Sequence, residues 1–375
     1  MSNHQKHSNL VRSEKGVFSK FEIGLLGSNC ENIRKIALLI SRSLKNDFNV
    51  SYLDADHKNE DNSSAKPLVF HEEFIDKISH FQLSLNNHKN LDLSYKNFIN
   101  SHLTVINGNH FSSSNQIVII DSIKKNSLIK RKDNLNNVIA LIGLEGVIIP
   151  DYIKALIHGY SQLPLFSINN KQGISDFVKS YLESKTPILN GLILGGGHSK
   201  RMGTDKILMD YHGESQYHYL TKLMGSKCKE VFVSCREEQN FKFSNMIIDS
   251  FKDLGAYGGI LSAFRFNPNS AWLTIACDIP LLNEDTVAFL IENRDPSKLA
   301  TCFYNSKTKF PEPLITIWEP KAYPVLLNFL SLGYSCARKV LINSEIKLIK
   351  LNDQKLLINA NTSIERGKAI AILNK

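Results

Sequence analysis

A run of glycines after an apolar stretch constrains this chain more than any other feature. Residues 188–194 read as a buried strand, and the glycines that follow it are Gly195, Gly196 and Gly197. Consecutive glycines let the backbone approach a ligand closely and turn its N–H groups toward an anion. Arg201 and Lys206 then add positive charge to the same segment. The pattern predicts a phosphate-binding loop between a strand and a helix, and the alternative is an ordinary tight turn.

The chain has 375 residues, which exceeds the usual size of one domain. Residues 1–20 are polar and basic without the apolar core of a secretory signal, so we expect a flexible tail on a cytoplasmic protein. A strand signal restarts directly after Pro187. We therefore predict one domain over residues 21–185 and a second over residues 188–375.

Composition excludes several classes of protein. Hydrophobic residues make up 42% of the chain, and no apolar run approaches the roughly 20 residues that span a bilayer. The six cysteines form no C-x-x-C pair, which favours reduced thiols over disulfides or structural zinc. The formal charge of +9 is spread along the chain, and its densest cluster, residues 123–134, is typical of a solvated helix face. We expect no nucleic-acid or membrane partner.

The first half alternates between apolar strands and amphipathic helices, an α/β pattern. Its first helix begins at about Glu31 and carries an apolar stripe at three- and four-residue spacing, which consists of Ile33, Ile36, Ala37, Ile40 and Leu44. A second helix is expected over residues 173–184. Strands are expected at residues 21–26, 50–54, 103–107, 116–121 and 138–141. Residues 57–66 are polar and predict a loop.

The second half repeats the alternation from Ile188 onward. Strands are expected near Gly191 and at residues 230–234, 246–249, 272–277 and 300–304, with helices between them. This order predicts a doubly wound, mostly parallel sheet, whose ligands gather at the carboxyl ends of the strands.

Asp278 lies just after the apolar strand 271–276, with Cys277 between them. A carboxylate at a strand end beside a phosphate-binding loop is a suitable ligand for Mg²⁺, which usually takes one or two protein carboxylates plus substrate phosphates. The alternative is a helix N-cap before Asn283, with Pro280 beginning the helix.

Two further segments carry candidate contacts. Residues 249–260 contain Asp249 and a glycine-rich turn that runs into a helix near Gly259, where the chain can pass close to a base or ribose. Asn359 and Asn361 occupy alternate positions at an expected strand end, so both side chains can face one cleft. Capping of the terminal helix is the equally supported alternative for these two amides.

These motifs together resemble the molybdenum cofactor guanylyltransferases, the MobA-like nucleotidyltransferases, over about residues 188–375. The family signature L-A-G-G-x-S-x-R-M-G-x-D-K matches residues 194–206, with Gly195 in place of alanine. The family's D-x-P motif matches residues 278–280, and its N-x-N-T matches residues 359–362. Its G-P-L-A-G-I turn matches residues 255–260 only loosely, without the proline, and Cys235–Arg236 stand where the family often has asparagine, which leaves base selection open.

The resemblance implies a Rossmann-like, GT-A-like nucleotidyltransferase fold that transfers GMP from GTP to molybdopterin with Mg²⁺ and releases pyrophosphate. It implies a role in nucleotide binding for Leu194, Gly195, Gly196, Gly197, Lys206, Asp249 and Asp278. It also implies catalysis by Arg201, Lys206 and Asp278, metal binding by Asp278, and substrate or metal contacts by Asn359 and Asn361. Beyond GTP and molybdopterin, the molybdoenzymes or their chaperones form a further class of partner.

The first half resembles the MobB-type adaptor domain, a P-loop NTPase relative, over roughly residues 20–150. Residues 24–32 occupy the place of the phosphate loop but lack its Gly-Lys-Ser/Thr ending, and Glu31 puts negative charge at the helix N-terminus. We therefore expect two three-layer α/β/α domains, the first with a structural or adaptor role. The spacing of His57, His71 and His110 does not favour a metal site.

Two other functions remain open. One is a related nucleotidyltransferase that uses CTP or a sugar phosphate. The other is a non-catalytic scaffold in molybdenum cofactor assembly, which only the altered loop in the first half supports.

Overall fold

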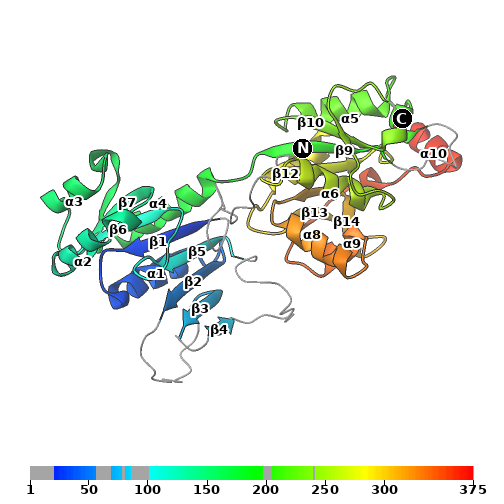
Figure 1. The fold of residues 1–375 in the computed structure, drawn as a ribbon. Coiled ribbons are helices and arrows are strands. Elements are labelled where there is room, and N and C mark those ends of the chain that lie inside the picture. Colours follow the sequence, from blue (N-terminus) through cyan, green and yellow to red (C-terminus); the bar gives the residue numbers. More distant parts are fainter. Residues whose placement is uncertain are drawn as a thin grey trace, which may run out of the picture. The chain divides into compact units, whose positions relative to one another are not determined.

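The computed structural model describes residues 21–55, 69–77, 81–85, 101–196, 205–239 and 241–374. The chain divides into two compact units, Met1–Lys185 and Thr186–Lys375. Each unit is built on one sheet, which confirms the expected α/β class (Figure 1). No helix in the described ranges is both long enough and apolar enough to span a lipid bilayer.

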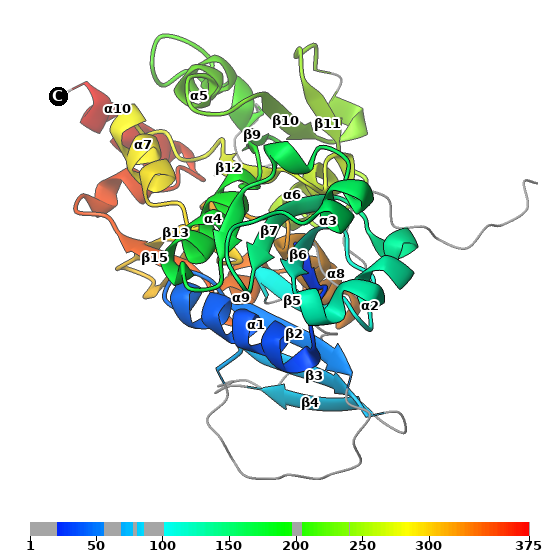
Figure 2. The same ribbon diagram turned by 90° about the vertical axis from the view of Figure 1, so that its left-hand side faces the viewer.

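The sheet of the first unit is parallel except for one strand, and its order is β4-β3-β2-β5-β1-β6-β7-β8. Its strands are β1 Glu22–Leu26, β2 Val50–Ala55, β3 Glu72–Asp76, β4 Phe81–Leu85, β5 Leu103–Asn107, β6 Gln116–Ile120, β7 Val138–Gly143 and β8 Leu165–Ser167. The antiparallel strand is β4, which lies at the edge of the sheet beside β3 (Figure 2). The sequence predicted neither β3 nor β4.

The α-helices that the described residues of this unit form are α1 Cys30–Leu44, α2 Lys125–Lys130, α3 Asp151–Leu156 and α4 Lys171–Ser184. Neighbouring residues of β6 enter different cores, because successive side chains of a strand point to opposite faces. Ile117 and Ile119 pack in the core that holds α1 and α4, whereas Val118 and Ile120 pack in the core that holds α2 and α3. The unit therefore has the three layers expected from its sequence.

Helix α1 shows how the sequence produces these layers. Its predicted apolar stripe is buried throughout, with Ile33, Ile36, Ala37 and Ile40 fully inaccessible to solvent. The side chain of Asn29 caps its first turn by accepting a hydrogen bond from the backbone N–H of Asn32 at 2.8 Å.

The sheet of the second unit has the order β11-β10-β9-β12-β14-β13-β15. Its strands are β9 Leu189–Leu194, β10 Val231–Cys235, β11 Met246–Ile248, β12 Ala271–Ala276, β13 Ala300–Asn305, β14 Phe310–Trp318 and β15 Lys347–Lys350. All run parallel except β14, which is antiparallel to both β12 and β13. The carboxyl ends of β9, β10, β12, β13 and β15 therefore meet at one edge of the sheet.

In the described part of the second unit the α-helices are α5 Gln216–Gly225, α6 Ala256–Phe266, α7 Glu284–Glu292, α8 Ala322–Ser331, α9 Ala337–Ile342 and α10 Ser363–Leu373. Helices α6, α8 and α9 lie together on one side of the sheet (Figure 1), and α5 packs against α7. Helix α6 begins three residues before the predicted Gly259, directly after Gly255, whose φ of 55° only glycine adopts readily.

Candidate active site

The glycine turn after β9 is closely packed, so a Cβ at either of its described glycines would require a neighbouring side chain to shift. A Cβ on Gly195 would lie 2.7 Å from the Cδ1 of Ile207, and one on Gly196 would lie 2.7 Å from the Oδ2 of Asp249. The N–H of Gly195 donates to the carbonyl of Ser234 at 3.0 Å, which continues the pairing of β9 with β10. Gly196 therefore brings the backbone against the Asp249 carboxylate. Gly197 and Arg201 lie outside the described residues.

Asp249 follows β11 and faces this turn. It accepts a hydrogen bond from the hydroxyl of Ser234 at 2.6 Å. Burial raises the pKa of the Asp249 carboxyl to about 6, against the lowering effects of Ser234 and the Arg236 guanidinium. The turn is further held by Gln239 in the 3-10 helix η5 (Glu237–Gln239), which donates to the Gly195 carbonyl at 3.0 Å.

Lys206, Asp278 and Asn361 meet at the carboxyl edge of the sheet. The Lys206 Nζ lies 3.4 Å from the Oδ2 of Asp278 and donates to the Oδ1 of Asn361 at 2.6 Å. Lys206 begins the 3-10 helix η4 (Lys206–Leu208), and Asp278 lies two residues after β12. The 3-10 helix η4, the end of β12 and the segment before α10 thus contribute to one cluster.

One oxygen of the Asp278 carboxylate can accept a further interaction from a ligand. Its side chain is only 14% exposed, and within the described ranges its Oδ1 is buried without a hydrogen-bond partner. Burial raises the pKa of the Asp278 carboxyl, while the Lys206 ammonium opposes that rise. A buried carboxylate oxygen with no donor is costly unless a ligand supplies the missing interaction.

Asp278 is not the N-cap of α7, so the alternative interpretation of this residue as a helix cap is wrong. The N-cap of α7 is Asn283, whose Oδ1 accepts from the backbone N–H of Thr286 at 3.0 Å. The carbonyl of Asp278 instead accepts from the N–H of Ala360 at 2.7 Å. This bond ties the end of β12 to the segment that leads into α10.

The side chains of Asn359 and Asn361 do not cap α10, which was the alternative to a role in the site. The cap of α10 is Thr362, which forms a capping box with Glu365, and the side chain of Asn361 is bonded to Lys206. The expected strand end is wrong, because Asn359 and Asn361 follow the 3-10 helix η6 (Gln354–Leu357). Asn359 is partly buried in the same segment.

One acidic residue near the site was missed. Ile275 of β12 pairs with Ile315 of β14, and continuing this antiparallel register brings Glu312 opposite Asp278. Glu312 is 3% exposed, and its burial raises the pKa of its carboxyl. A charged residue inside the otherwise apolar run 310–318 was the available signal, but the two flanking prolines argue against a strand.

Among the described residues of this site, Asp278 presents a buried carboxylate oxygen that a metal ion could bind. The part of the chain that the structure describes contains no group of three or more His, Cys, Asp or Glu residues able to hold a metal. The orphaned Oδ1 of Asp278 nevertheless fits Mg²⁺, which completes its shell with water and substrate phosphate oxygens. Of His57, His71 and His110, whose spacing does not favour a metal site, His57 lies outside the described residues.

Comparison with known proteins identifies relatives of the second unit. A family model described as a MobA-like NTP transferase domain matches residues 191–347. A probable molybdenum cofactor guanylyltransferase from Carboxydothermus hydrogenoformans is 30% identical over 191 residues, which cover 48% of this chain and 95% of that protein.

Two further matches were found. A molybdenum cofactor biosynthesis bifunctional protein from a Synechocystis species is 34% identical over 189 residues, or 49% of this chain, and the match spans about half (54%) of that relative's length. The crystal structure of molybdopterin-guanine dinucleotide biosynthesis protein A from Archaeoglobus fulgidus aligns with a TM-score of 0.42 at 19% identity, covering 50% of this chain and 99% of that one.

The matched domain and the strand-edge site define a nucleotidyltransferase. The chain belongs to the MobA-like NTP transferase family. The likeness of the first unit to a P-loop-type adaptor domain stays a prediction.

Proposed function

We propose that the second unit transfers GMP from GTP to the phosphate group of molybdopterin. The observation that carries this proposal is the cluster of Lys206, Asp278 and Asn361, with a buried carboxylate oxygen that has no donor within the described ranges. The printed names of the relatives, a probable molybdenum cofactor guanylyltransferase among them, support the choice of GTP and of this acceptor.

In the proposed reaction an oxygen of the acceptor phosphate attacks the α-phosphorus of GTP. A new P–O bond forms, the bond between the α-phosphorus and the bridging oxygen breaks, and pyrophosphate leaves with its electron pair. The attacking phosphate is already ionised, so the protein needs no dedicated general base. Its task is to hold the two phosphates in line and to neutralise the developing charge.

Each part of the site has a role in this scheme. The turn at Gly195 and Gly196 brings the backbone close to the triphosphate, and Lys206 supplies positive charge where the leaving group departs. Arg201, outside the described residues, is proposed to add a second cation. Asp249, beside the turn, is proposed to contact the nucleotide.

Magnesium is part of the proposal. Asp278 would hold the ion through its orphaned oxygen, and Asn359 and Asn361 are proposed as further contacts to metal or substrate. Bound Mg²⁺ would neutralise phosphate charge as a Lewis acid. Asn361, by binding the Lys206 ammonium, keeps that cation beside Asp278.

The test is pyrophosphate release by the purified full chain with Mg²⁺ and molybdopterin, using GTP, CTP or a sugar phosphate with either nucleotide. Release that requires GTP and molybdopterin supports the proposal. Release with CTP, or with a sugar phosphate as acceptor, would identify a related nucleotidyltransferase instead. No release in any mixture, with folded protein confirmed by circular dichroism, would leave only the scaffold role.

A further inference from the structure

The loop between β12 and α7, residues 277–282, is held by two side chains from another part of the second unit. The Nε2 of His212 donates to the carbonyl of Pro280 at 2.9 Å. The hydroxyl of Tyr219 donates to the carbonyl of Leu282 at 2.7 Å. Both acceptors belong to buried residues, and buried backbone carbonyls need partners of this kind. The two bonds therefore fix the path of the loop.

The rings of His212 and Tyr219 also hold each other. Their centroids lie 3.6 Å apart and their planes differ by 10°, which is a stacked arrangement. Tyr219 is part of α5, whereas His212 lies in a turn before this helix, where its backbone N–H donates to the Oδ1 of Asp210 at 3.1 Å. Asp210 pairs with Ser215 in a β-bridge that closes the turn. Because each ring limits the rotation of the other, the two donors keep a fixed spacing.

The bond from His212 joins the same two segments as the ion pair of the candidate active site. Lys206 lies six residues before His212, and Asp278 lies two residues before Pro280. The bond from His212 to Pro280 and the 3.4 Å ion pair of Lys206 with Asp278 therefore link one pair of segments twice. An apolar cluster lies between these segments and includes Met209, Tyr211 and Leu281.

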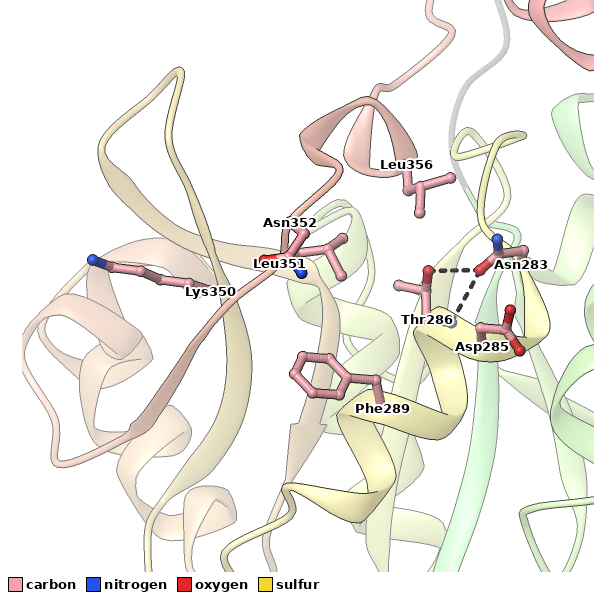
Figure 3. Close-up of a pocket in the computed structure, with 8 residues that line it drawn as sticks. All are labelled: Asn283, Asp285, Thr286, Phe289, Lys350, Leu351, Asn352 and Leu356. Carbon is pink, nitrogen blue, oxygen red and sulfur yellow. Dashed lines mark hydrogen bonds between the residues drawn. The ribbon is translucent and has the colours of Figure 1, made fainter.

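Both ends of the loop are fixed by other contacts. Near its start, the carbonyl of Asp278 accepts from the N–H of Ala360 at 2.7 Å. Directly after it, Asn283 caps α7 by accepting from the backbone N–H of Thr286 at 3.0 Å and from its hydroxyl at 2.6 Å (Figure 3). The bonds from the two stacked rings lie along the stretch between these points. Loss of those bonds would let this stretch, and the carboxylate at its start, shift.

We propose that His212 and Tyr219 are positioning residues for the Asp278 carboxylate. They act through the loop: by binding two of its carbonyls, they keep the carboxylate directed at the metal ion and the reacting phosphates. Groups that support a metal ligand commonly affect metal affinity and activity, because small displacements of a reacting group are costly. This inference rests on the proposed function, in which Asp278 is the metal ligand, and it adds the residues that hold this ligand in place.

The first test measures binding of Mn²⁺ alone to the full chain by electron paramagnetic resonance. Asp278→Asn identifies the signal that belongs to this site. We expect Tyr219→Phe and His212→Phe to weaken that binding about tenfold. Thr221→Val is the matched control, because it removes a hydroxyl-to-carbonyl bond of the same 2.7 Å length from α5, and the acceptor of that bond, Tyr217, lies in α5 itself. The control should lower the urea midpoint as much as Tyr219→Phe and leave Mn²⁺ affinity unchanged.

A rescue variant tests whether the bond from His212 is what matters. His212→Gln places an amide N–H donor near the position of the Nε2, so it should recover most of the Mn²⁺ affinity that His212→Phe loses. Failure to recover it would assign the effect to packing of the ring and overturn the role of the bond. Unchanged Mn²⁺ affinity in Tyr219→Phe and His212→Phe, or wild-type binding that ignores Asp278→Asn, would overturn the inference. Tyr219→Phe removes only a hydroxyl, so the test stays valid if His212→Phe does not fold.

Turnover separates this inference from the proposed function. In pyrophosphate release with GTP, Mg²⁺ and molybdopterin, we expect kcat to fall about tenfold in His212→Phe and Tyr219→Phe, with the KM for molybdopterin within about twofold of the wild type. Weakened Mn²⁺ binding in both variants, without transfer by the wild type, would support the positioning role and contradict the proposed function. Transfer by the wild type, with kcat and Mn²⁺ affinity unchanged in both variants, would support the proposed function and overturn the positioning role.

Discussion

The two units end their central strands with buried aspartates that are bonded in opposite ways. In the first unit, both oxygens of Asp54 are occupied: Oδ2 accepts from the hydroxyl of Tyr52 at 2.6 Å, and Oδ1 accepts from Asn107 at 2.7 Å and from the backbone of Ala55 at 2.8 Å. In the second unit, the Oδ1 of Asp278 has no donor among the described residues.

The same contrast extends along the edge of the first sheet. Asp121, after β6, accepts from the hydroxyl of Ser28 at 2.6 Å and from the backbone of Ile123 at 3.0 Å. Asn107 in turn receives the N–H of Asn109 through its Oδ1. These strand ends satisfy one another's hydrogen bonds, as the interior of a structural domain does.

Asp54 and Asp278 show how similar positions in two α/β units can serve stability in one case and chemistry in the other. A carboxylate whose donors are all supplied by the fold stabilises that fold. A carboxylate left short of donors costs stability and is kept where a ligand completes it. The predictions below test whether this difference divides the roles of the two units.

The largest effect is expected from Asp278→Asn. Loss of the charged ligand should reduce nucleotidyl transfer by about 10²- to 10³-fold, because charge neutralisation at the reacting phosphates is usually a major part of catalysis. Stability should change by less than about 1 kcal/mol, because the replacement removes a buried charge without leaving a cavity. Pyrophosphate release and urea denaturation measure the two quantities. A stability loss without a loss of activity would make Asp278 a structural residue like Asp54.

Asp54→Ala should give the opposite result. The variant leaves the hydroxyl of Tyr52 and the amide of Asn107 without their buried acceptor, at a cost of about 3 kcal/mol in unfolding free energy. Nucleotidyl transfer by the second unit should be unchanged. Urea denaturation, with hydrogen exchange in β1 and β2, measures the loss, and Asp54→Asn is the control that keeps an acceptor. A fall in transfer rate at full folding would contradict the division of roles.

Asp249 predicts a pH dependence of stability. Its pKa rises from an ordinary 3.8 to about 6 on folding, so the folded chain binds more protons between these values, and stability falls as the pH rises through that window. The difference of about 2 corresponds to about 3 kcal/mol at most. The advantage of Asp249→Asn over the wild type should therefore grow by about 2 to 3 kcal/mol between about pH 3.5 and pH 7. A constant difference would show that Asp249 is not strained by its burial.

The smallest effect is expected from Lys222→Ala, the matched control for Lys206→Ala. Lys222 also pairs with a carboxylate, that of Glu214 at 2.8 Å, but its side chain is 73% exposed. Its removal should change stability by less than about 0.5 kcal/mol and leave transfer unaffected. Removal of the Lys206 ammonium should slow transfer about 10- to 100-fold. Equal effects of the two variants would deny Lys206 a special role.

The sequence predicted most central strands because their buried runs are apolar on both faces. The strand over residues 103–107 agrees with β5 at both ends, and the helix over residues 173–184 lies within α4. Strand β3 was missed because it begins with Glu72 and Glu73, both buried, which an apolar pattern does not detect. Strand β14 was missed because Pro311 and Pro313 are typical of loops.

The site was predictable as separate motifs but not as an assembly. Sequence indicated Lys206 by its place beside the glycines and Asp278 by its place after an apolar strand. The bond between Lys206 and Asn361 joins residues 155 positions apart, and no local pattern encodes such a pair. The sequence also does not predict that the oxygens of Asp54 have hydrogen-bond donors whereas the Oδ1 of Asp278 has none among the described residues. Both aspartates lie at or just after the end of an apolar strand.

The bond between Lys206 and Asn361 also has a consequence for synthesis of the protein. A nascent chain that has emerged from the ribosome as far as α7 contains Lys206 and Asp278 but lacks the amide of Asn361 that binds the lysine. The complete cluster requires closure of a long loop late in translation. Ribosome-bound intermediates are therefore expected to present the glycine turn well before they acquire a finished catalytic centre.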